Sequence, residues 1–154
     1  MRFSSVYESC TNRLQSTQSI WLLLVRLVLA YGFYHPAMMK WQDIDGIADW
    51  FSSIGIPAPH LNAYLATYTE ILGVILLTLG LGVRWISIPL IITMLVAIKT
   101  VHWANGFEAG NNGFEIPLYY ILFLLLLLTQ GAGRISLDEL VNRLLRRKQN
   151  KAVA

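Results

Sequence analysis

The sequence predicts an all-α integral membrane protein, a four-helix bundle with short amphipathic helices at the membrane surface. Its 154 residues are 55% hydrophobic and only 14% charged, whereas about a quarter of the residues are charged in a typical soluble domain. The mean hydropathy is +0.51, and the apolar residues gather in blocks. This composition excludes a disordered or fibrous chain and favours a single membrane domain over residues 1–154.

Four apolar blocks predict four membrane-spanning helices, because each approaches the roughly 20 residues needed to cross a bilayer. The predicted helices cover residues 20–39, 61–81, 85–103 and 115–130. Glycine, proline and asparagine separate the blocks at 55–59, 80–82 and 106–113, where they disfavour a continuing helix. Pro57 or Pro59 is expected to open the second helix, since an N–H is not needed there.

The basic residues predict that both termini lie in the cytoplasm. Arg2, Arg13, Arg84, Arg134 and the basic run at 143–151 all fall on one side of the predicted spans. The connectors on the other side carry Lys40 together with several acidic residues. Loops rich in Lys and Arg stay in the cytoplasm.

Short amphipathic stretches are expected to lie on the membrane surface. At 136–148, Ser136 and Glu139 form a capping box, and leucines then alternate with arginines at helical spacing. A weaker apolar stripe occurs at the N-terminus (Phe3, Val6, Tyr7, Cys10 and Leu14), and another in the first outer loop (Ile44, Ile47, Ala48 and Phe51). The net charge of +3 is therefore assigned to the membrane surface, and no nucleic-acid motif accompanies it.

Ionisable residues inside the apolar blocks are the first candidates for a functional site, because they are costly in a bilayer. They are Arg26, Glu70, Lys99, His102 and Glu115. The depths of Glu70 and Lys99 along their helices allow the two to meet, and Arg26 is long enough to reach Glu70 as well. Two interpretations stay open: a buried ion pair that fixes helix packing, or a group that handles a ligand or proton.

A polar cluster is also predicted at the outer ends of the helices, from Lys40, Lys99, His102 and Glu115. These residues either anchor the helix ends at the lipid headgroups or form a site for an anionic group, a quinone headgroup or a metal. The single cysteine, Cys10, excludes an internal disulfide or a thiol pair. No metalloprotease or nucleophile motif is present, so the chain is expected not to be an enzyme.

His35, Met38 and Met39 follow one another at helical spacing near the end of the first block. An imidazole with two thioethers suits Cu(I) better than a hard cation. The alternative is ordinary packing of methionine side chains.

The order of several short motifs resembles the DoxX family of small four-helix bacterial membrane proteins, from about Trp21 to Leu140. The motifs are Arg26, Gly32, Lys40, Gly55-Ile56-Pro57-Ala58-Pro59, Glu70-Ile71-Leu72-Gly73, Gly80-Leu81-Gly82-Val83-Arg84, Glu115 and Gly131-Ala132-Gly133-Arg134-Ile135-Ser136-Leu137-Asp138. The resemblance implies a multi-pass protein of the bacterial inner membrane. Its glycines, such as Gly73, fit close helix packing within one chain or between two copies.

Four further segments are similar to the HvfX branch of that family: Met38-Met39-Lys40-Trp41, Ser87-Ile88-Pro89-Leu90, Thr100-Val101-His102-Trp103 and Asn105-Gly106-Phe107-Glu108. That branch implies an accessory role in making or exporting copper-binding modified peptides, with copper as a possible cofactor and a protein or modified peptide as a partner. Other DoxX relatives imply the alternative, a subunit of a quinone-linked oxidoreductase complex of the DoxX/DoxD type.

Overall fold

The predicted all-α class is confirmed by a computed structural model, which describes the backbone of residues 2–153 and the side chains of residues 17–146. This part of the chain contains six α-helices and no strand. The apolar stripe predicted at the N-terminus, from Phe3 to Leu14, lies outside the described side chains, as does Lys148 in the basic tail.

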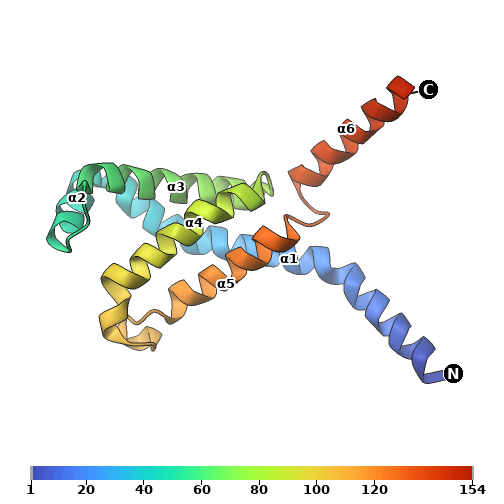
Figure 1. Cartoon of the computed structure of the whole chain (residues 1–154), viewed down its shortest axis with the longest axis horizontal. Coiled ribbons are helices and arrows are strands. Elements are labelled where there is room, and N and C mark those ends of the chain that lie inside the picture. Colours follow the sequence, from blue (N-terminus) through green and yellow to red (C-terminus); the bar gives the residue numbers. More distant parts are fainter. Residues whose placement is uncertain (1, 154) are drawn as a thin grey trace.

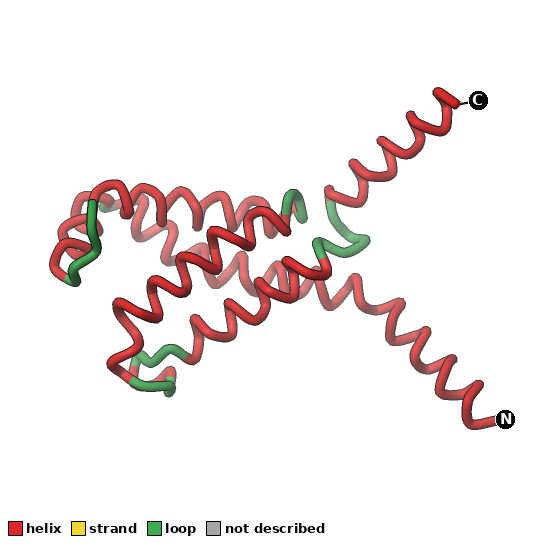
Figure 2. Tube along the Cα trace, viewed as in Figure 1, coloured by secondary structure: helices red, strands yellow, loops and turns green. Residues whose placement is uncertain are grey.

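The helices follow one another along the chain with short connections, except for the longer segment 98–114 between α4 and α5 (Figures 1 and 2). Their bounds are α1 Arg2–Gln42, α2 Ile44–Ser53, α3 Pro59–Leu79, α4 Val83–Ala97, α5 Glu115–Gln130 and α6 Leu137–Val153. A π-helical turn, Ile98–His102, prolongs α4. The first helix is longer than the predicted 20–39, because no glycine or proline interrupts the preceding residues 2–19. As expected from the prolines, α3 begins at Pro59.

Three helical stretches are long and apolar enough to cross a membrane: 17–42, 59–79 and 83–105. The fourth predicted span, α5, is apolar but has only 16 residues. Four crossings and cytoplasmic termini therefore stay predictions.

The core lies where α1, α3, α4 and α5 meet. Leu29, Phe33, Leu77, Leu90 and Leu124 are fully buried there. The main pairings are α1 with α3 and α4 with α5. Gly73 allows α3 to approach α4 closely, because a Cβ at this position would stand 2.9 Å from both methyl carbons of Leu90. In this chain, Gly73 thus serves packing between two of its own helices.

Helix α2 was predicted to rest its apolar face on the membrane, but α3 covers that face instead. Ala48 and Phe51 are buried against Ala63 of α3. Asp43 begins the helix, since its side chain accepts a hydrogen bond from the N–H of Gly46 at 2.9 Å. The apolar face of the ten-residue helix α2 is therefore packed within the protein, against α3.

The bundle has two distinct ends (Figure 1). We call the end that carries the 80–82 turn and the 131–136 linker the inner end. The end that carries α2 and the 98–114 segment is the outer end. Helix α6 and the first turns of α1 project from the inner end. Beyond Leu90, no residue of 91–105 is buried, and Ile91 and Met94 pack against the core while partly buried. The outer half of α4 is therefore less buried than its inner half.

Candidate functional site

An ion pair between Lys40 and Glu70 links the last turn of α1 to the middle of α3. The ammonium Nζ lies 2.9 Å from Oε2 and 3.1 Å from Oε1 of the carboxylate. The Glu70 side chain is 3% exposed and the Lys40 side chain 16%. Glu70 comes eleven residues after Pro59, roughly 16 Å along the helix axis. A carboxylate this far inside an apolar helix is stable as an anion only because a cation meets it.

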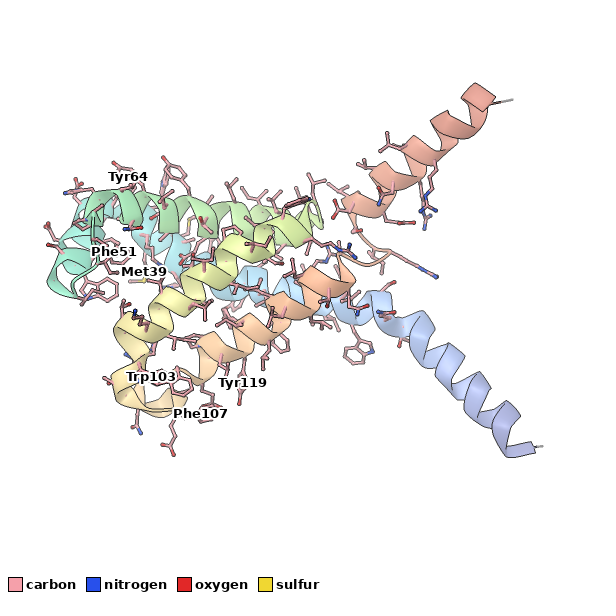
Figure 3. The ribbon with its side chains drawn as sticks, viewed as in Figure 1. Met39, Phe51, Tyr64, Trp103, Phe107 and Tyr119 are labelled. Atoms are coloured by element: carbon pink, nitrogen blue, oxygen red, sulfur yellow. The ribbon has the colours of Figure 1, made fainter. Side chains whose placement is uncertain are left out.

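Aromatic side chains flank this ion pair on both helices. Trp41 follows Lys40 and packs edge-on against Tyr68, with ring centroids 5.9 Å apart. Tyr64 stacks on Tyr68 at 6.2 Å. All three rings are partly exposed, and Figure 3 shows Tyr64 on the outward side of α3. These rings form one aromatic cluster between the end of α1 and the first half of α3.

Sequence reasoning considered Lys99 and Arg26 as partners for Glu70. Among side chains 17–146, the Glu70 carboxylate instead forms its hydrogen bonds with Lys40 only. Lys99 lies in the π-helical turn after α4. Its side chain is exposed and forms no hydrogen bond or ion pair with the side chains and backbone that the structure describes. Lys99 follows the part of α4 that contacts the core: the last fully buried residue of α4 is Leu90 and the last one packed on the core is Met94.

Arg26 lies at the inner end, where it joins three segments. Its guanidinium donates to the carbonyl oxygens of Leu77, at 3.3 Å, and Ile135. The residue is 1% exposed. Gly80 sits directly against the guanidinium, and a Cβ there would overlap it. Arg26 therefore fastens α1 to the end of α3 and to the linker after α5.

Asp138 completes this inner contact, and sequence reasoning did not single it out as a site residue. Its carboxylate accepts a hydrogen bond from the N–H of Gly82 at 2.8 Å, and its own N–H donates to the carbonyl of Gly80 at 3.1 Å. The sequence held one signal for this contact: the predicted topology places the 80–82 turn and residues 131–138 at the same membrane face. We call Arg26, Asp138 and the 80–82 turn the inner clasp.

His102 ends the π-helical turn after α4 and Glu115 begins α5, so the two residues stand at the ends of the α4–α5 connection, and neither bonds to Lys40. The Nδ1 atom of His102 lies 2.8 Å from the carbonyl oxygen of Asn112. Because a carbonyl only accepts, Nδ1 carries the proton. Glu115 accepts from the N–H of Ala109 at 3.0 Å and from the Tyr119 hydroxyl at 2.9 Å. The predicted outer cluster is therefore divided between the ion pair and this loop.

The three residues considered for copper lie near the end of α1. His35 is exposed, Met38 is half-buried and Met39 is 56% exposed. Figure 3 shows Met39 on α1, apart from Trp103 and Phe107 in the α4–α5 loop. Among side chains 17–146, no group of three or more His, Cys, Asp or Glu is placed to hold a metal ion. A copper site here would depend on the thioethers.

Sequence comparisons agree with this architecture. The DoxX family pattern matches residues 21–103. An uncharacterised protein of Haemophilus influenzae is 34% identical over 131 residues, which cover 79% of this chain and 83% of that protein. The putative oxidoreductase CatD of Bacillus subtilis is 31% identical over 119 residues, covering 77% and 85% of the two chains.

The inner membrane protein YphA of Escherichia coli is 30% identical over 129 residues, covering 80% of this chain and 91% of YphA. No solved structure matches the chain. The family match includes Arg26, Lys40 and Glu70, and the named relatives extend over most of the chain. This protein is a membrane protein that belongs to the DoxX family.

Proposed function

We propose that this chain is a non-enzymatic accessory protein of a metal or oxidative stress system in the bacterial inner membrane, with the Lys40–Glu70 pair at its binding centre. The observation that carries the proposal is the buried carboxylate of Glu70, which receives both hydrogen bonds from one lysine. Ionisable groups inside a membrane protein mark sites for ligands, ions or protons. Lys40 stays partly exposed, and its ammonium has a third donor for a ligand.

Copper, or a modified peptide that carries copper, is the ligand we propose. His35 and Met39 are exposed one helical turn apart on α1, and their donor atoms suit Cu(I). His102 keeps its Nε2 lone pair free, because Nδ1 donates to Asn112. The similarity of the Met38-to-Trp41 and Thr100-to-Trp103 segments to the HvfX branch supports the same ligand.

Copper content of the full chain, purified in a mild detergent after copper loading, tests the metal assignment. Stoichiometric copper that is lost in His35→Ala, Met38→Ala and His102→Ala would support it. His60→Ala and Met94→Ala are matched controls, since they remove the same side-chain types elsewhere. Absence of copper from the wild type, or equal loss in the controls, would contradict direct copper binding.

Copper tolerance of a deletion strain that carries each variant tests the role of the ion pair. Glu70→Gln and the double variant Lys40→Met/Glu70→Met, which leaves no buried charge, should lower tolerance while the amount of protein in the membrane stays constant. If tolerance falls only in proportion to protein abundance, the ion pair serves packing and the proposed binding centre is wrong.

A subunit of a quinone-linked oxidoreductase complex is the second candidate function. The similarity to the putative oxidoreductase CatD favours it, together with the Trp41 and Tyr68 rings next to the lysine, which offer a quinone ring an aromatic surface. This function requires a partner protein for the redox centre. Co-purification of a quinone or a flavoprotein, lost in Trp41→Ala and kept in Trp50→Ala, would favour it over the accessory role.

A further inference from the structure

An open pocket of about 530 Å³ lies at the inner end, apart from the Lys40–Glu70 pair. Its walls come from the part of α1 near Ser19, the start of α4, the 131–136 linker and the start of α6. Pockets for small molecules occupy roughly 300–1,000 Å³. The pocket is therefore large enough for a headgroup-sized ligand.

Arg84, at the start of α4, lines the pocket with its guanidinium. Its Nη2 donates to the carbonyl oxygen of Thr129 at 3.1 Å, which fixes the orientation of the group. Gly131 lies beside it with φ +80°, and a Cβ there would stand 3.2 Å from Nε. Because a guanidinium has five N–H donors, four of them stay available to a ligand.

Arg134 forms a second wall of the pocket. Its backbone N–H donates to the Ser19 hydroxyl at 3.3 Å, which holds the linker against α1. Its side chain is exposed. Neither Arg84 nor Arg134 forms an ion pair with any carboxylate among the described side chains.

The acidic residues of the pocket are already occupied. Asp138 accepts from the N–H of Gly82 and faces Arg26 in the inner clasp. Glu139 accepts from Arg143 Nε at 2.7 Å. Glu139 also interacts with the charge of Arg134. Four arginines (Arg26, Arg84, Arg134 and Arg143) therefore surround two carboxylates in this region, which leaves it a net positive charge.

The pocket also lies at the depth where apolar segments end. The candidate spans begin at Thr17 and Val83, and α5 ends at Gln130. Trp21 is 63% exposed and Trp85 81%. Exposed tryptophan at the end of an apolar helix is typical of the headgroup region of a membrane.

We propose that this pocket binds a phosphate-bearing anion through Arg84 and Arg134. Planar guanidinium groups bind phosphate oxygens in pairs, and basic pockets between membrane helices accept anionic headgroups. The phosphate belongs either to an anionic phospholipid or to a soluble phosphate ester, and the two share the same chemistry. This site is independent of the function proposed for the outer end.

Native mass spectrometry of the detergent-purified full chain tests the proposal, with phosphatidylglycerol, phosphatidylcholine and glycerol 3-phosphate as probes. We expect one phosphatidylglycerol per chain, bound more tightly than phosphatidylcholine. Arg84→Gln and Arg134→Gln should each weaken binding by about tenfold, because each removes charged hydrogen bonds. Arg146→Gln is the matched control: it removes the same charge from α6 outside the pocket, and should change binding by less than about twofold.

The outcomes separate the two sources of phosphate. Displacement of phosphatidylglycerol by millimolar glycerol 3-phosphate, or binding of this ester alone, would assign the site to a soluble phosphate ester. Resistance to displacement would assign it to the lipid. Equal weakening by Arg146→Gln, or no preference for either phosphate anion over phosphatidylcholine, would overturn the proposal. If Arg84→Gln lowers the thermal midpoint, Arg134→Gln decides, since the exposed Arg134 side chain forms no hydrogen bond or ion pair among the described residues.

Discussion

Lys40 Nζ lies 2.9 and 3.1 Å from the two carboxylate oxygens of Glu70, and so joins the outer end of α1 to the middle of α3. At the inner end, Arg26 joins the same α1 to the carbonyl of Leu77 on α3. Helix α1 is thus held to α3 by two cations, the buried Arg26 at the inner end of the bundle and the partly exposed Lys40 at the outer end, with the apolar residues Leu29 and Phe33 between them.

Removing one partner of the Lys40–Glu70 pair should destabilise the protein more than removing both. Lys40→Met leaves a buried carboxylate without a cation, a change that costs about 3–5 kcal/mol. The double variant Lys40→Met/Glu70→Met leaves no buried charge and should recover most of this loss. Unfolding of all variants in detergent, analysed as a double-mutant cycle, measures the coupling. Purely additive losses would mean that the two side chains do not stabilise each other.

The inner clasp should require the fork of an arginine. Arg26→Lys keeps the charge, but its single ammonium does not reproduce the two bonds to Leu77 and Ile135. We expect a loss of about 1–3 kcal/mol for Arg26→Lys, and a larger one for Arg26→Leu. The thermal midpoint in detergent measures both. Equal midpoints for wild type and Arg26→Lys would show that only the charge is needed.

The start of α2 should depend on the side chain of Asp43. Asp43→Ala removes the hydrogen bond to the N–H of Gly46, and the loss of such a cap costs about 1 kcal/mol. Asp43→Asn keeps an acceptor and should restore most of the stability. Hydrogen exchange at the amides of 44–47 reports the effect locally. Unchanged exchange at Gly46 in the alanine variant would contradict this role.

The pKa of Glu139 should depend on its hydrogen bond with Arg143. That hydrogen bond is the main cause that lowers the pKa of Glu139 below its ordinary value of 4.5. The stabilisation of α6 by the ionised carboxylate is therefore complete above pH 4.5, and it is lost as the pH falls through the lowered pKa.

Carboxyl NMR of the full chain in micelles measures this pKa directly. Arg143→Gln should raise the pKa of Glu139 toward 4.5, and Arg146→Gln should raise it less, because Arg146 acts only through its charge. A larger rise in Arg146→Gln than in Arg143→Gln would contradict the assigned hydrogen bond.

Much of the fold could be predicted, because it depends on local patterns. Apolar blocks of about 20 residues predict helices that leave water, and the glycine and proline clusters mark where those helices end. Pro59 begins α3 and Ser136 precedes the start of α6, as expected. Of the two bonds of the predicted capping box, the Glu139 N–H donates to Ser136 Oγ at 3.3 Å, whereas the Glu139 carboxylate accepts from Arg143. The family was also evident from short motifs along the chain.

The partners of the charged residues were decided by the tertiary structure. The depth of Glu70 in α3 follows from the sequence, but the cation it meets depends on how far α3 is displaced along α1 and how each helix is rotated. Helix α2 packs on the first turns of α3, and this offset brings Lys40, at the end of α1, level with Glu70. Lys99 forms no bond with Glu70, because it lies beyond Met94, the last residue of α4 that packs against the core. Sequence spacing fixes positions along one helix, whereas contacts between helices depend on the packing of all of them.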